Sequence, residues 1–186
     1  RVVLELTRAY NNRGKYNVTI QPSLTTLDRN RVDVQIDIKE GKAAKIRHIN
    51  IVGNEAFPQD DLREGWESST TNWLSWYRRD DQYSREKLSG DLEKLNSYYL
   101  DRGYVDFDVE STQVSITPDR RDIQLTANVR EGEIYTISEA IVTGDTVIPQ
   151  EEMENLVFIR KGHVFSRRML ELTSDAMTSL LGNIGY

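Results

Sequence analysis

Residues 83–104 read YSREKLSGDLEKLNSYYLDRGY and carry the signals of a complete amphipathic helix. Its apolar residues recur at the spacing of one helical stripe, and they are Leu88, Leu92, Leu95 and Tyr99. Ser84 is a suitable N-cap, because its hydroxyl can accept from a free N–H of the first turn. Gly103 predicts the end of the helix, since glycine enters the left-handed conformation of a C-terminal cap without penalty.

The chain contains this stretch three times. Residues 165–186, FSRRMLELTSDAMTSLLGNIGY, match it at a constant offset of 82, and residues 3–14 match its second half. A second register, at an offset of 91, joins residues 32–58 to residues 123–149. Two long registers of this kind indicate a tandem array with a period of about 80–90 residues. The difference between the offsets predicts an insertion between Pro58 and Tyr83.

The repeats predict one complete unit, residues 43–132, between two partial ones, residues 1–42 and 133–186. The complete unit reads as a strand at 46–52, a short helix from Pro58 to about Trp66, the long helix, and strands at 104–117 and 123–129. This β-α-α-β-β order predicts a two-layer α+β domain. The first partial unit supplies a helix end and strands at 16–24 and 32–38, the latter with one buried and one wet face. The last supplies a strand at 137–142, a helix near 151–158 and the long helix.

Arg1 lies inside a repeated helix, so we expect the chain to be part of a longer one. A less favoured hypothesis is that the last piece of one molecule completes the first piece of another by domain swapping.

Composition argues against several functional classes. The net charge of −6 disfavours nucleic acid as a partner, because a basic surface normally supplies that affinity. No apolar run approaches the length needed to span a membrane, and the chain has no cysteine. His48 and His163 lack the companions of a metal site, and no nucleophile–base pair or phosphate loop occurs. We therefore expect no catalytic residue, no metal and no cofactor.

The strand at 104–117 changes its buried face along its length. Val105, Phe107 and Val109 are apolar at odd positions, whereas Val114 and Ile116 are apolar at even ones. Because side chains alternate strictly between the faces of a strand, this change predicts a β-bulge between Glu110 and Gln113.

The repeat order, together with INIVGN at 49–54, YYLDRGY at 98–104 and VREG at 129–132, resembles the POTRA domain. The resemblance covers the whole chain and is closest to the arrays of the BamA family of outer-membrane assembly factors. Residues 49–54, 90–104 and 111–119 are similar to the third unit of such an array, which would make the flanking pieces the end of unit two and the start of unit four. Each unit is then expected to be a three-stranded mixed sheet packed on two helices.

The resemblance also implies a function. BamA-type arrays lie in the periplasm ahead of a C-terminal membrane β-barrel and assist insertion of other β-barrels into the outer membrane. The implied partners are unfolded outer-membrane proteins, a BamB-type lipoprotein and other accessory lipoproteins of the assembly complex, and the fragment itself is not expected to span the membrane.

A three-stranded sheet with helices on one face leaves an open edge whose N–H and C=O groups can pair with an extended client. The strand at 104–117 is our candidate for that edge, with the alternative that solvent or a neighbouring unit covers it. The candidate contact residues are Val105, Asp106, Phe107, Asp108, Glu110, Ser111, Thr112 and Gln113.

The three tryptophans and one tyrosine lie within twelve residues, at Trp66, Trp73, Trp76 and Tyr77. Trp66 is expected in the core. Trp73, Trp76 and Tyr77 are candidates for an aromatic contact surface, because such residues are enriched at binding hot spots, or for packing against an adjacent unit. Two rival functions stay open: the POTRA region of another transporter, such as a two-partner secretion pore, and an architectural spacer that binds no client.

Overall fold

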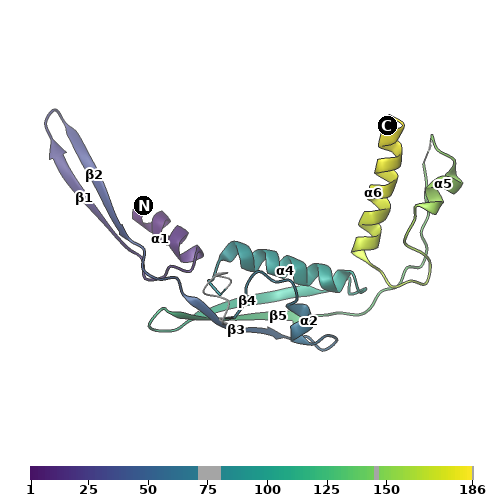
Figure 1. The fold of residues 1–186 in the computed structure, drawn as a ribbon, viewed down its shortest axis with the longest axis horizontal. Helices are drawn as coiled ribbons and strands as arrows, with labels where there is room; N and C mark the ends of the chain where they lie inside the picture. The colour runs from purple at the N-terminus through teal and green to yellow at the C-terminus, as the bar shows by residue number, and fades with distance from the viewer. Residues whose placement is uncertain (71–80, 145–146, 186) are drawn as a thin grey trace. The chain divides into compact units, whose positions relative to one another are not determined.

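The computed structural model describes residues 1–70, 81–144 and 147–185 (Figure 1). Its helices and strands, in chain order, are α1 Val2–Asn12, β1 Thr19–Leu27, β2 Arg31–Lys39, β3 Lys45–Val52, α2 Gln59–Leu62, α4 Arg85–Leu100, β4 Asp108–Ile116, β5 Asp122–Arg130, α5 Gln150–Asn155 and α6 Arg167–Asn183. The strands at 16–24, 32–38 and 46–52 and the three long helical segments are thus confirmed to within a few residues.

The described residues form two compact units. The first comprises Arg1–Val52, Arg63–Leu92 and Ser111–Asn128, and the second comprises Gly53–Leu62, Glu93–Glu110 and Val129–Tyr186. Their limits divide the central repeat. The first flanking piece shares a unit with one part of that repeat, and the last flanking piece shares a unit with the other part. The repeat limits 1–42, 43–132 and 133–186 therefore stay a prediction.

The central sheet has the strand order β3-β5-β4, with β3 parallel to β5. Residues 117–121 join β4 to β5 as a hairpin, and the Thr117 N–H donates to the Asp122 carbonyl at 3.0 Å. In Figure 1, α4 runs along this sheet beside β4 and β5. The arrangement confirms the predicted α+β class with a three-stranded mixed sheet.

The apolar stripe of α4 supplies the helical side of the core. Leu88, Leu95 and Tyr99 are at most 7% exposed. Leu88 and Tyr83 share one cluster with Ala44, which precedes β3, and with apolar residues of β3 and β5, namely Ile46, Ile49, Ile123 and Leu125. The Ser84 hydroxyl accepts from the Lys87 N–H at 3.5 Å, which is the predicted N-cap.

Two sets of bonds recur between repeats, each within one compact unit. The Tyr10 hydroxyl donates to Glu40 at 3.2 Å, and in the next repeat the Tyr99 hydroxyl donates to Glu131 at 2.7 Å. Both bonds tie the end of the long helix to the end of the last strand.

The links between repeats follow the same plan. The Ala44 N–H donates to the Gly14 carbonyl, and the Tyr135 N–H donates to the Gly103 carbonyl, both at 2.8 Å. The glycines end their helices at φ values of +73° and +92°, and a Cβ on Gly103 would lie 2.5 Å from Val164. Glycine is therefore required where the next repeat approaches the helix end.

Three predictions about strands were wrong. Residues 137–142 form no strand, and only an isolated bridge joins Thr136 to Val164. In the central repeat the equivalent strand, β3, pairs with β5, and the described chain holds no counterpart of β5 for residues 137–142. The predicted buried face of β2 is largely exposed, with Val32 and Val34 at 55% and 57%. Among the described elements, α1 is the helix that contacts this hairpin, and it does so through β1.

The third correction concerns the strand predicted from Tyr104. Residues 104–107 form a turn, in which the Phe107 N–H donates to the Tyr104 carbonyl at 3.2 Å, and β4 begins at Asp108. Phe107 instead stacks on Tyr99, with ring centroids 4.1 Å apart, and is 8% exposed. Burial of this ring, which the alternating pattern could not distinguish from a strand position, holds the chain in the turn.

Candidate functional site

β4 lies at an edge of the central sheet, where it has β5 as its neighbour on one side. In an antiparallel pair, alternate residues direct their N–H and C=O groups toward the partner and away from it. The Thr117 N–H points toward β5 because it donates to Asp122. By alternation, the backbone groups of Val114 and Ile116 point toward the open side.

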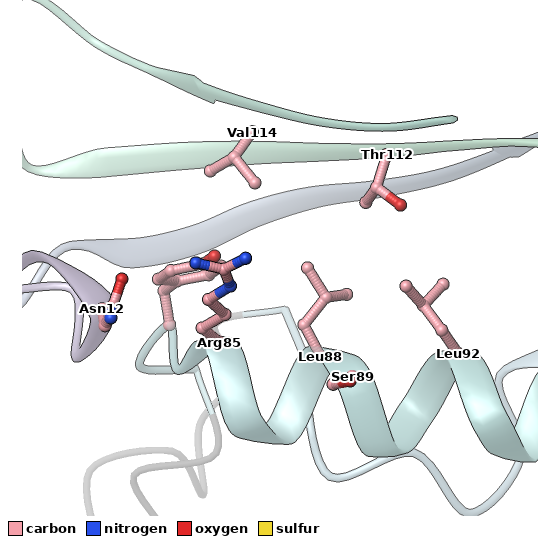
Figure 2. Close-up of a pocket in the computed structure, with 8 residues that line it drawn as sticks. Asn12, Arg85, Leu88, Ser89, Leu92, Thr112 and Val114 are labelled. Atoms are coloured by element: carbon pink, nitrogen blue, oxygen red, sulfur yellow. The ribbon is translucent and has the colours of Figure 1, made fainter. Parts of the chain in front are cut away.

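A groove lies between this edge strand and α4. It has a cavity volume of about 410 Å³ and lies wholly within the first compact unit. It is lined by Asn12, Tyr83, Arg85, Leu88, Ser89, Leu92, Thr112 and Val114. Figure 2 shows the Leu88 and Leu92 side chains rising from α4 and those of Thr112 and Val114 reaching toward them from β4. The groove thus places apolar side chains of α4 beside a strand edge that is unpaired among the described residues.

Arg85 and Asn12 lie toward one end of the groove. Arg85 is exposed and Asn12 stands beside it at the end of α1 (Figure 2). Glu86 is adjacent in sequence, but its carboxylate accepts from the Ser84 hydroxyl at 2.7 Å. That hydrogen bond is the main cause that lowers the pKa of Glu86, so this carboxyl stays ionised.

The tyrosines at this end are structural. Burial raises the pKa of Tyr16 to about 12 and also raises the pKa of Tyr83. Their ring centroids lie 6.4 Å apart. Both phenols are therefore neutral at ordinary pH, and Tyr83 lines the groove without adding charge.

The predicted contact residues have different environments. Asp108, Glu110, Ser111, Thr112 and Gln113 lie on β4 and are exposed, and Thr112 lines the groove. Val105 and Asp106 lie in the preceding turn, where Asp106 accepts from the Tyr135 hydroxyl at 2.7 Å. Phe107 belongs to the core, so assigning these three residues to a pairing strand was wrong.

Sequence reasoning assigned Leu88 and Leu92 to one apolar stripe of a helix and did not assign Val114 to a contact site, yet all three line the groove. Leu92 is only half-buried, although the helical stripe that contains it is correct. The signal that could have identified the site was the position of that stripe beside a predicted edge strand.

The bulge between Glu110 and Gln113 stays a prediction. Val109 and Val114 are the half-buried residues of β4, five positions apart, and an odd separation on one face requires an added residue. A register irregularity does occur in β3, between Ile46 and His48.

Trp73, Trp76 and Tyr77 lie outside the described residues. Trp66 is half-buried and packs against the core cluster, as expected, and its buried indole Nε1 has no hydrogen-bond partner among the described residues. Across residues 1–70, 81–144 and 147–185, no three His, Cys, Asp or Glu side chains are grouped as metal ligands would be. Within the same ranges, no helix combines the length and apolar character of a membrane span.

A family model described as POTRA, surface antigen variable number repeat, matches residues 1–41, 44–132 and 135–186. Among curated proteins, the outer membrane protein assembly factor BamA of Neisseria meningitidis is 30% identical over all of this chain and 24% of its own length. BamA of Buchnera aphidicola is 30% identical over 84% of this chain and 25% of its own length. The chain thus spans about a quarter of the length of these relatives.

Among solved structures, POTRA domains 3–5 of Haemophilus influenzae BamA align with 99% of this chain and 68% of their own, with a TM-score of 0.60 and 19% identity. At that identity the similarity supports the fold alone. The three matched stretches of the family model extend along nearly all of the chain.

Proposed function

The chain belongs to the POTRA family, and from this premise we propose that it is a periplasmic scaffold that binds extended segments during assembly of outer-membrane proteins. It acts as a binding module rather than an enzyme. The clients are unfolded outer-membrane proteins, and the accessory partners are lipoproteins of the assembly complex, including a BamB-type protein. The similarity to BamA proteins supports this role in assembly. Repeat limits at 1–42, 43–132 and 133–186 are part of the proposal.

The observation that carries the proposal is the edge of β4, unpaired among the described residues, beside a groove lined by both apolar and polar side chains. A client strand paired with β4 satisfies its own backbone groups and those of the edge. Its alternate side chains then face α4 and contact Leu88, Leu92 and Val114. Because main-chain pairing ignores side-chain identity, one edge can receive many client sequences.

The proposal is tested with a peptide of alternating valine and threonine, titrated into the chain by fluorescence anisotropy. In a paired strand, the valine residues share one face, and their N–H groups share one edge. Two matched peptides carry N-methyl groups on either the valines or the threonines. Only one of these sets donates to β4, so one peptide should lose at least about ten-fold in affinity, because each lost bond is worth about 1 kcal/mol. The other should bind like the parent.

If both N-methylated peptides bind with the affinity of the parent, edge pairing is contradicted, although the peptide can still bind in the groove. If the parent peptide does not bind at all, the spacer function gains support. The exposed residues of β4 allow a further check, because a Thr112→Pro substitution places a residue without an N–H on the groove-lining part of the edge.

A further inference from the structure

Arg85 is the cation of the groove that has no ionic partner among the described residues. Its guanidinium rises from α4 toward β4 and stands next to Leu88 (Figure 2). The neighbouring carboxylate, Glu86, is bound by the Ser84 hydroxyl. Asn12 is uncharged, and Ser89 carries only a hydroxyl. A charged group is therefore presented to whatever occupies the groove.

The third repeat shows how the same arginine is satisfied elsewhere. At the offset of 82, Arg85 corresponds to Arg167, and Ser89 corresponds to Glu171. Arg167 pairs with Glu171 one turn along α6, with the Nε and Oε1 atoms 2.8 Å apart. In the central repeat the acid is replaced by serine, so α4 offers its arginine no such partner. This difference is not required by the fold, because both helices form.

The spacing along α4 matches the spacing of a bound strand. At about 1.5 Å per residue, Leu92 and Leu88 are separated by about 6 Å along the helix axis, and alternate residues of a strand are separated by about 6.7 Å. Arg85 lies about 4.5 Å further along. Three successive inward-facing residues of a strand can therefore meet Leu92, Leu88 and Arg85 in turn.

We propose that Arg85 makes this groove selective for a strand that carries an aspartate or glutamate side chain two residues beyond a pair of alternating apolar residues. The selected pattern is apolar-x-apolar-x-acid along the direction from Leu92 to Arg85. An internal acidic residue fits because β4 continues to Ile116, beyond the groove-lining Val114, so pairing need not stop at the arginine. This selectivity rests on the proposed function, since it requires a strand paired with β4.

The test uses the full chain and peptides with amidated C-termini that contain Val-Thr-Val-Thr-Glu or the same sequence with glutamine. The glutamate peptide should bind about 2- to 5-fold more tightly, the range of a partly exposed ion pair. In Arg85→Gln the two peptides should bind equally. The matched control Arg167→Gln removes the equivalent arginine of the third repeat and should preserve the preference. Arg85→Glu should reverse the preference, so that a peptide with lysine in place of the glutamate binds more tightly than the glutamate peptide.

Three results separate the possible failures. Equal binding of both peptides to the unaltered chain overturns the selectivity and leaves strand pairing intact. No binding of either peptide overturns the selectivity and the proposed function together. A third result concerns the glutamine peptide with a free C-terminal carboxylate. If it binds more tightly than the amidated glutamine peptide, if Arg85→Gln removes that difference, and if the two amidated peptides bind equally, the internal acidic side chain is overturned as the ligand.

Discussion

Replacing Tyr99 by phenylalanine should lower the stability of the central repeat. The Tyr99 side chain is 0% exposed, and its hydroxyl donates to the Glu131 carboxylate at 2.7 Å. Glu131 also accepts from the backbone N–H groups of Glu55 and Ala56, at 3.0 Å and 3.1 Å. One carboxylate thus joins α4, the end of β5 and the turn after β3.

The expected loss is about 1.5 kcal/mol of unfolding free energy. A hydrogen bond to a charged group contributes roughly 1.5–3 kcal/mol, and the lower end applies because Glu131 keeps its two backbone donors and stays half-exposed. The phenylalanine ring keeps its stacking on Phe107. Tyr98→Phe is the matched control on the same helix: its hydroxyl has no hydrogen bond to any of the described residues, so the change should cost less than about 0.5 kcal/mol.

Urea unfolding followed by tryptophan fluorescence is the assay. All three tryptophans lie in the central repeat, so the signal reports that repeat and not its neighbours. A multi-repeat chain need not unfold in one step, which makes this local signal preferable to total helicity. If Tyr99→Phe is within about 0.5 kcal/mol of the unaltered chain, or no different from Tyr98→Phe, the inferred role of the Tyr99–Glu131 bond is wrong.

Three further predictions concern the same repeat. In the same urea assay, Gly53→Ala should destabilise it by more than about 2 kcal/mol, since φ is +96° and a Cβ would lie 2.1 Å from the Val129 carbonyl oxygen. Gly90→Ala should instead stabilise it by about 0.5–1 kcal/mol, because a Cβ on Gly90 of α4 meets open space. Asp91→Ala should cost about 2–4 kcal/mol by leaving the Glu67 and Ser68 N–H groups without their acceptor, while exposed Glu93→Ala should change little in thermal unfolding. Burial, followed by the bond to Glu131, raises the pKa of Tyr99 above the ordinary value of 10.0. The contribution of the neutral phenol to the free energy of unfolding should therefore be complete below pH 10 and should be lost as the pH rises from 10 toward the raised pKa. Urea unfolding at a series of pH values above 10 should show a smaller loss of stability in Tyr99→Phe than in the unaltered chain. Parallel stability curves for the two proteins would contradict this explanation.

Local signals predicted the helices of this chain well. In α4 the cap at Ser84, the stripe through Leu88 and Tyr99, and the stop at Gly103 all act over a few residues, so the sequence alone determines them. The strand at 104–117 was chosen as the edge after the resemblance to POTRA domains, and the edge position of β4 agrees with that choice. The signals of the helix need no knowledge of distant contacts.

The errors lie where distant partners decide the structure. Residues 137–142 have a strand-like pattern but no pairing strand, and the turn at 104–107 depends on Phe107 meeting Tyr99. The groove was missed for a similar reason. Whether Leu92 is buried or lines a surface depends on the position of β4 beside it, which periodicity along one helix does not contain.

The most direct test of edge-strand binding is an NMR titration of the ¹⁵N-labelled chain with the alternating valine–threonine peptide. Amide shifts should concentrate in residues 108–116 of β4 and in residues 85–92 along the groove. The hairpin at 19–39 should be unaffected. Shifts confined to residues 66–77, or no shifts at saturating peptide, would contradict the assignment of β4 and its groove as the binding site.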